Sequence, residues 1–272
     1  MADHTEAYAA IKQIQELITK VSIKAWIEQT PETMNTRFGT IERAAKAFKR
    51  SSYKIKKLAL EQTDRIEYCK PGSMAIRGYY CPDPMQDIII TNCKRPNIAK
   101  RRLTVPPYLI YHFNSENELN MIEEKGVIGG IYDKTELLIR FDNFRIGFSF
   151  PDIINDPERY IDVRLECKTK GKYILSYYSV VRKKDGYHIS EQNESILITF
   201  SDGLPRKWIR MSEWMDMPSI LKELYHLEDG DHICAREYEL FYDESGYPLE
   251  YVRNGVVCPA AHVKLPVMDG MI

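Results

Sequence analysis

The stretch at residues 40–80, TIERAAKAFKRSSYKIKKLALEQTDRIEYCKPGSMAIRGYY, is the part of the chain that most strongly favours a particular fold. Between Ile41 and Phe48 the apolar residues recur at helical spacing and would form one core-facing side, and Thr40 is a suitable N-cap. Lys49 and Arg50 interrupt this apolar side. We therefore predict a helix that begins at Thr40 and ends in a tight turn at Lys49 and Arg50.

A second helix is predicted after this turn, with Ser51 or Ser52 as its N-cap. Its apolar residues are spread over residues 53–60, and the lysines between them would face solvent or phosphate. Over residues 65–80, two alternating runs flank Pro71 and Gly72, which is typical of a β-hairpin.

The order of helix, turn, helix and hairpin resembles the winged helix-turn-helix superfamily over residues 20–84. In that superfamily the second helix lies in the major groove of DNA while the first crosses the backbone. The resemblance implies a nucleic-acid partner, expected to be DNA. It also implies a set of basic contact residues from the turn, the second helix and the wing, namely Lys49, Arg50, Lys54, Lys56, Lys57, Lys70 and Arg77.

The distribution of charge agrees with this interpretation. The formal net charge is −1, yet residues 40–103 hold 15 Lys and Arg against 6 Asp and Glu. A basic segment beside an acidic one is expected where only one part of a protein meets phosphate. A lysine-rich helix face in solvent would give the same count without any ligand.

The length allows one large domain or two of ordinary size, and we expect a soluble chain. The 272 residues are 44% hydrophobic, which is enough for a sizeable core. We place the domain boundary in the proline-rich segment at residues 81–85 and expect a helical domain at 1–84 and a β-rich domain at 85–272. No apolar run reaches 18 residues and the N-terminus does not read as a signal peptide, so we expect an intracellular protein, cytoplasmic or nuclear.

The expected fold class is α+β, with the C-terminal domain a mainly antiparallel sandwich or partly open barrel. Runs of strand length dominate after residue 87, including residues 137–141, 160–167 and 195–200. Helices are predicted at residues 7–29, 115–126 and 208–227.

A short motif around His112 suggests an enzymatic alternative. The run YHFN at residues 111–114, followed by a predicted helix and Gly126, resembles the opening of ADP-ribosyltransferases and the related RNA 2'-phosphotransferases. The resemblance covers residues 108–127 and 236–243. It implies that His112 binds a nicotinamide dinucleotide and that Glu237 or Glu239 supplies the catalytic glutamate of a late strand.

A second alternative is a metal-dependent nuclease, in which Asp152 and Glu166 would hold Mg²⁺ while Lys168 helps to activate water. Charged residues on solvated strand edges explain the same pattern. The run DGDH at residues 229–232 is read as a turn, and the six cysteines form no C-x-x-C pair. Because the common nucleotide-binding motifs are also absent from the sequence, we predict no resident metal and no cofactor.

A third alternative is a self-assembling structural protein, including a viral one. The 18 tyrosines and 10 methionines would then serve as interface anchors of a homo-oligomer. The leading interpretation remains a nucleic-acid-binding module followed by a β-rich domain for assembly or ligand sensing.

Overall fold

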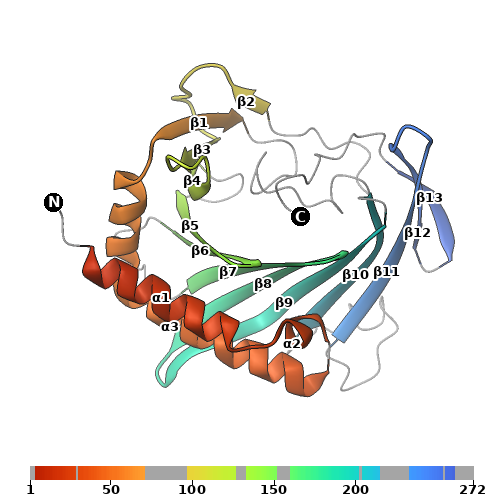
Figure 1. Ribbon diagram of the computed structural model, residues 1–272, viewed down its shortest axis with the longest axis horizontal. Helices are drawn as coiled ribbons and strands as arrows, with labels where there is room; N and C mark the ends of the chain where they lie inside the picture. The colour runs from red at the N-terminus through yellow and green to blue at the C-terminus, as the bar shows by residue number, and fades with distance from the viewer. Residues whose placement is uncertain are drawn as a thin grey trace.

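Over the residues that it describes, this computed structural model has three helices followed by one large sheet (Figure 1). The helices are α1 (Thr5–Thr19), α2 (Ile23–Ile27) and α3 (Pro31–Glu61). The structure describes residues 4–28, 30–70, 97–126, 133–151, 160–201, 204–214, 233–253 and 255–260. None of the helices in these ranges combines the length and apolarity needed to cross a membrane.

The turn predicted at Lys49 and Arg50 is wrong, because α3 is a single helix through residues 31–61. It begins with a capping box, in which the Thr33 amide donates to Thr30 Oγ1 at 3.3 Å and the Thr30 amide donates to Thr33 Oγ1 at 3.1 Å. Pro31 occupies the first helical position, where its missing N–H costs nothing. Neither glycine nor proline occurs between Thr40 and Glu61, and lysine, arginine and alanine favour helix, so nothing breaks α3 at the predicted turn.

The predicted helix over residues 7–29 is instead two helices. The first ends at Thr19, and Ser22 caps the second by accepting a hydrogen bond from the Ala25 amide at 3.2 Å. This break lets Trp26 turn towards the sheet, where its ring meets that of Phe144 with 6.3 Å between centroids.

Within the described ranges, 13 strands form one sheet in the order β13-β12-β11-β10-β9-β8-β7-β6-β5-β4-β3-β1-β2, and neighbouring strands are antiparallel. The strands are β1 (Arg65–Lys70), β2 (Asn97–Ala99), β3 (Tyr108–Phe113), β4 (Leu119–Lys125), β5 (Lys134–Phe141), β6 (Phe144–Pro151), β7 (Tyr160–Thr169), β8 (Lys172–Lys183), β9 (Gly186–Ser201), β10 (Leu204–Trp214), β11 (Ile233–Tyr242), β12 (Pro248–Arg253) and β13 (Val256–Pro259). The α+β class and the antiparallel arrangement are confirmed. Over these strands the sheet is single and not closed.

Two segments predicted as helices in the C-terminal part are strands over the residues that the structure describes. Residues 119–125 form β4, which pairs with β3 so that Tyr111 and Ile122 lie opposite each other, and this pairing overrides local helix propensity. Residues 208–214 belong to β10, and the rest of that predicted helix lies outside the described ranges.

The predicted wing is described only in its first strand. β1 lies between β2 and β3, with Tyr68 opposite both Ala99 and Ile110. The expected second wing strand near residues 74–80 and the expected domain boundary after residue 84 lie outside the described residues.

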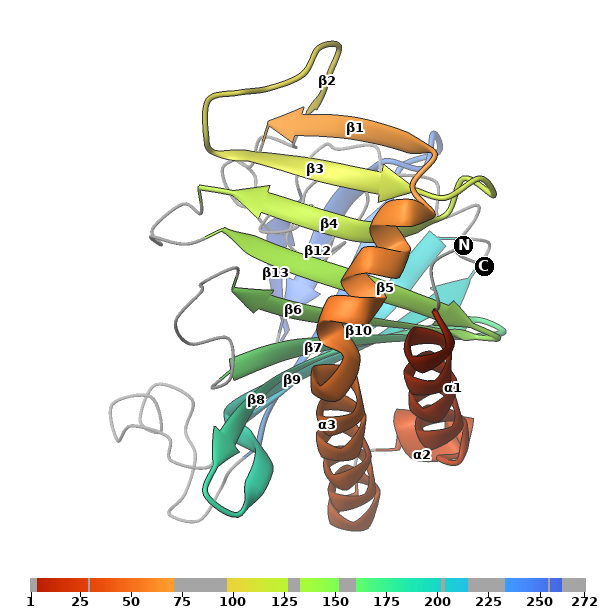
Figure 2. The same cartoon turned by 90° about the vertical axis from the view of Figure 1, so that its left-hand side faces the viewer.

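The sheet is strongly curved, and the helices pack on its convex face (Figure 1). The opposite face is concave. α3 crosses the strands obliquely (Figure 2). The Phe48 ring of α3 stacks on the Phe148 ring of β6, with 4.3 Å between centroids and 4° between planes. On β7 the residues Ile161, Val163 and Leu165 face this helical layer, so helices and sheet share one hydrophobic core. The alternate residues of the same strands therefore line the concave face.

Candidate functional site

Charged side chains gather on the concave face where β5, β6 and β7 run side by side. The strand register aligns them in rows across the sheet. One row joins Glu136 to Ser149 and Asp162. Another row, four residues further along β5, joins Arg140 to Arg145 and Glu166.

Four of these charged residues form a continuous chain of ion pairs, which we call the charge row: Glu136, Arg164, Glu166 and Arg145. Nη2 of Arg145 lies 2.7 Å from the Glu166 carboxylate, and Nη2 of Arg164 lies 2.8 Å from it. Arg164 Nε lies 3.7 Å from Glu136 Oε1. All four residues are buried, and Arg164 and Glu166 are each only 2% exposed.

Glu166 of the charge row is ionised despite its burial. Burial opposes ionisation of Glu166, but the guanidinium groups of Arg164 and Arg145 outweigh it and lower the pKa of this carboxyl from 4.5 to about 2. A buried carboxylate held by two arginines is therefore a fixed charge over the whole physiological pH range.

Gly147 makes room for this arrangement. It lies on β6 between Leu138 of β5 and Arg164 of β7. A Cβ atom at this position would overlap Oε1 of Glu136. The glycine therefore lets the Glu136 carboxylate lie over β6 and approach Arg164 two strands away.

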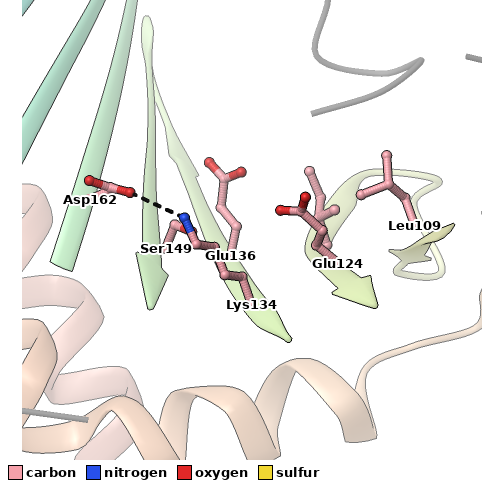
Figure 3. Close-up of a pocket in the computed structure, with 7 residues that line it drawn as sticks. Leu109, Glu124, Lys134, Glu136, Ser149 and Asp162 are labelled. Carbon is pink, nitrogen blue, oxygen red and sulfur yellow. Dashed lines mark ion pairs between the residues drawn. The ribbon is translucent and has the colours of Figure 1, made fainter. Parts of the chain in front are cut away.

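Beside the charge row lies a small recess of about 50 Å³ that opens to solvent. Its lining combines three carboxylates, one ammonium group and one hydroxyl with two apolar side chains: Leu109, Ile122, Glu124, Lys134, Glu136, Ser149 and Asp162. Figure 3 shows Glu124 and Glu136 pointing away from the helices. Asp162 lies 4.0 Å from Lys134 Nζ and accepts a hydrogen bond from Ser179 Oγ at 2.8 Å.

The chemistry of this lining suits a cation and an anion together. Carboxylates provide oxygen ligands for Mg²⁺, which is commonly held by one or two carboxylates plus the phosphates of a substrate. Lysine and arginine bind phosphate oxygens. In the described parts of the chain no three His, Cys, Asp or Glu side chains come close enough to hold a metal ion by themselves. A divalent cation here would therefore need ligand oxygens to complete its shell.

At the far end of β7, Lys168 lies on the same face as Glu166 and is partly buried. Burial lowers the pKa of Lys168 from 10.5 to about 8; Glu166 opposes this shift, whereas Arg145 and Arg140 add to it. We call Arg140, Arg145 and Lys168 the basic end of the concave face.

The predicted nuclease trio is only partly described. Glu166 and Lys168 share a face, as their spacing indicated, and Asp152 lies outside the described residues. The Glu166 carboxylate is held by Arg145 and Arg164, so it is poorly suited to the metal-ligand role in which it was predicted.

The three lysines expected on a recognition helix are engaged by other side chains. Lys54 forms an ion pair with Glu6 of α1, and Lys57 lies 3.9 Å from Glu61. Lys56 donates to Thr135 Oγ1 of β5 at 2.9 Å, so it ties α3 to the sheet.

The other basic residues predicted to contact nucleic acid are scattered. Lys49 and Arg50 lie within α3, and Arg50 is exposed. Lys70 is exposed at the end of β1, and Arg77 lies outside the described residues. The contacts with nucleic acid that were predicted for these residues stay a prediction.

The predicted pair His112 and Glu237 is not brought together. His112 is buried on β3, with Nε2 2.8 Å from Glu123 Oε1, whereas Glu237 is exposed on β11 and lies 2.8 Å from Lys207. The strands β4 to β10 separate them in the sheet order. A hydrogen bond with His112 is the main cause that lowers the pKa of Glu123 to about 2, against the opposing effect of burial.

Sequence reasoning missed most of the concave site: Glu124, Lys134, Glu136, Arg145, Ser149, Asp162 and Arg164. The available signal was the alternation in residues 161–168, where apolar and charged residues alternate at every step. Such alternation normally indicates a strand with one solvated face. Only the register between strands reveals that the charged face is buried and continuous.

Comparison with known protein families, characterised proteins and solved structures finds no match to this chain.

Proposed function

We propose that the concave face binds a phosphate-bearing ligand together with a divalent cation. The observation that carries this proposal is the buried charge row next to a recess lined by three carboxylates and a lysine. Ionised side chains with shifted pKa values in a concave site are a physical signature of function.

Packing alone gives no reason for charges at this place. Removing an ion from water costs on the order of several kcal/mol, and apolar replacements of buried ion pairs are often neutral or stabilising. Further along the same face, from β8 to β12, apolar and aromatic side chains fill the corresponding positions: Tyr173, Leu175, Ile198, Trp208, Tyr238, Leu240 and Tyr251. The concave face can therefore be packed without charges, and their concentration on β5–β7 supports a binding role.

The residues divide into two roles. Glu124 and Asp162 offer carboxylate oxygens to the cation, and Lys134 offers hydrogen bonds to phosphate. Arg164 fixes the position of Glu136. With three carboxylates and one lysine, the recess would repel a bare phosphate. A divalent cation held by these carboxylates would offset this repulsion, so ligand binding should require the metal.

The reaction class that this arrangement fits is hydrolysis of a phosphoanhydride or phosphoester. Glu124 and Asp162 would hold the divalent cation, which would supply Lewis acidity at a phosphoryl oxygen and a water of lowered pKa as the nucleophile. The chain's own residues would orient the phosphate and fix the cation.

The test is calorimetric titration of a nucleoside triphosphate in the presence of Mg²⁺ and then of EDTA, with phosphate release measured in parallel. We expect binding that depends on Mg²⁺ and that Asp162→Asn weakens about tenfold or more. Glu250→Gln, an exposed change on β12, serves as the matched control and should bind like the wild type. Equal binding in EDTA, or an unaffected Asp162→Asn variant of normal stability, would overturn the proposal.

A further inference from the structure

The basic end places like charges directly opposite each other. Arg140 of β5 and Arg145 of β6 are cross-strand partners, and Glu166 of β7 lies opposite Arg145 in the same row. Lys168 lies on β7, two residues after Glu166. Like charges facing each other across a ladder destabilise a sheet. The Glu166 carboxylate nearby is shared between Arg145 and Arg164, and Arg140 is 3.4 Å from Glu118.

This end is also reachable from solvent. The Arg140 side chain is 44% exposed, and Lys168 is partly exposed, while Arg145 lies beneath them in the charge row. Burial and the two neighbouring arginines favour the neutral form of Lys168, which an arriving anion would reverse.

The basic end is separated from the recess along the strands. Arg140 lies four residues from Glu136 on β5, which corresponds to roughly 13 Å, and Lys168 lies six residues from Asp162 on β7, which corresponds to roughly 20 Å. The contiguous phosphates of one nucleotide do not span such a distance. A ligand that meets both places must carry phosphates at intervals.

The surface between the two places is partly apolar. The intervening row joins Leu138, Gly147, Arg164 and Tyr177 across the sheet. Leu138 and Arg164 of this row are buried and Tyr177 is partly exposed, so the Tyr177 ring is the side chain of this row that can meet the sugar and base between two phosphates. An unbroken polyanion gains little from such a ring. Aromatic side chains stack on unpaired bases of single strands.

We propose that the ligand is a single strand of nucleic acid and that Arg140, Arg145 and Lys168 bind a phosphate one or more nucleotides away from the recess. This inference rests on the proposed function and deepens it. It also assigns nucleic-acid recognition to the concave face of the sheet instead of the lysines of α3.

The test measures the affinity of single-stranded oligonucleotides from a mononucleotide to an octanucleotide, by fluorescence anisotropy in Mg²⁺. We expect affinity to rise with length until the strand reaches the basic end. The double variant Arg140→Ala/Lys168→Gln should bind strands that reach the basic end about tenfold more weakly than the wild type. The slope of log affinity against log salt concentration should become shallower by about 0.7 for each phosphate that is no longer neutralised. Lys46→Gln, an exposed change on α3, is the control and should keep the full gain.

The outcomes separate this inference from the proposed function. Mg²⁺-dependent binding of a mononucleotide without any gain from length would overturn the inference and leave the proposed function standing. Absence of both mononucleotide and strand binding would overturn both. An equal gain with inorganic polyphosphate of matched length, or equal affinity for duplex, would overturn the choice of a single strand.

Discussion

The two faces of β5, β6 and β7 are built from the same strands and differ completely in chemistry. On β7, Val163 and Leu165 pack under the helices, while Arg164 and Glu166 between them carry the charge row. All four side chains are buried. Burial therefore does not decide whether the side chains on a sheet face are apolar or charged. The apolar side chains of the helix-facing side stabilise the fold, and we propose that the charged side chains of the concave side bind a ligand.

Replacing Arg164 with methionine should give the largest loss of stability. The change leaves two buried carboxylates, Glu136 and Glu166, without this guanidinium group. Breaking a buried ion pair on one side costs about 3–5 kcal/mol. Chemical denaturation of the purified variant checks this value, and a loss below about 1 kcal/mol would show that the row is hydrated in solution.

Replacing Leu165 with alanine should cost less, about 3 kcal/mol, because the loss is that of buried hydrocarbon and a cavity. Leu165 is 1% exposed and lies in the core shared with the helices. The same denaturation assay applies. Unlike Arg164→Met, this variant should retain Mg²⁺-dependent ligand affinity under conditions where it is folded; loss of affinity would contradict the separation of roles between the faces.

Acid should weaken both faces over the same pH window. The pKa of Glu166 on the concave face and that of Glu123 on the helix-facing side are lowered from 4.5 to about 2. Each carboxylate contributes stability that is present above about pH 4.5 and is lost as pH falls towards 2.

The free energy of unfolding, measured between pH 6 and the lowest pH at which the protein stays soluble, should therefore fall on acidification, by roughly 1.4 kcal/mol per pH unit for each proton taken up. Glu123→Gln and Glu166→Gln should each flatten this slope. An unchanged slope in either variant would show that its carboxyl titrates normally.

Replacing Gly147 with alanine should have a smaller effect on stability, about 1–3 kcal/mol, because the added methyl group displaces the Glu136 carboxylate. The informative measurement is ligand affinity, which should fall together with stability since the carboxylate is moved from Arg164. If stability falls but ligand affinity is retained, Glu136 contributes to stability and not to ligand binding.

The smallest effect is expected for Lys54→Ala and Lys57→Ala on α3. Both side chains are about half exposed and pair with acidic neighbours, so each change should alter stability by about 0.2–1 kcal/mol. Gel retardation of a DNA strand should be unchanged in both variants. Loss of retardation would return nucleic-acid recognition to α3.

Sequence reasoning predicted the broad class because local patterns carry it. The alternation of residues 161–168 predicted β7, and the helical stripe from Ile41 to Phe48 predicted part of α3. The turn at Lys49 and Arg50 failed because an interruption of the stripe by two good helix formers does not end a helix.

The concave site was predicted only in fragments for a physical reason. Glu166 and Lys168 are two residues apart on one strand, so their common face follows from strand geometry. The contact of Glu136 with Arg164 depends on a register spanning three strands and on the missing side chain of Gly147. No local pattern encodes such long-range alignment.

The most direct test replaces the charge row with apolar residues of similar size, in the variant Glu136→Leu/Arg145→Met/Arg164→Met/Glu166→Leu. Because paired buried charges contribute little net stability, this variant should fold with a denaturation midpoint close to that of the wild type. It should also have lost Mg²⁺-dependent binding of a nucleoside triphosphate. A folded variant that still binds the nucleotide with wild-type affinity would contradict the account.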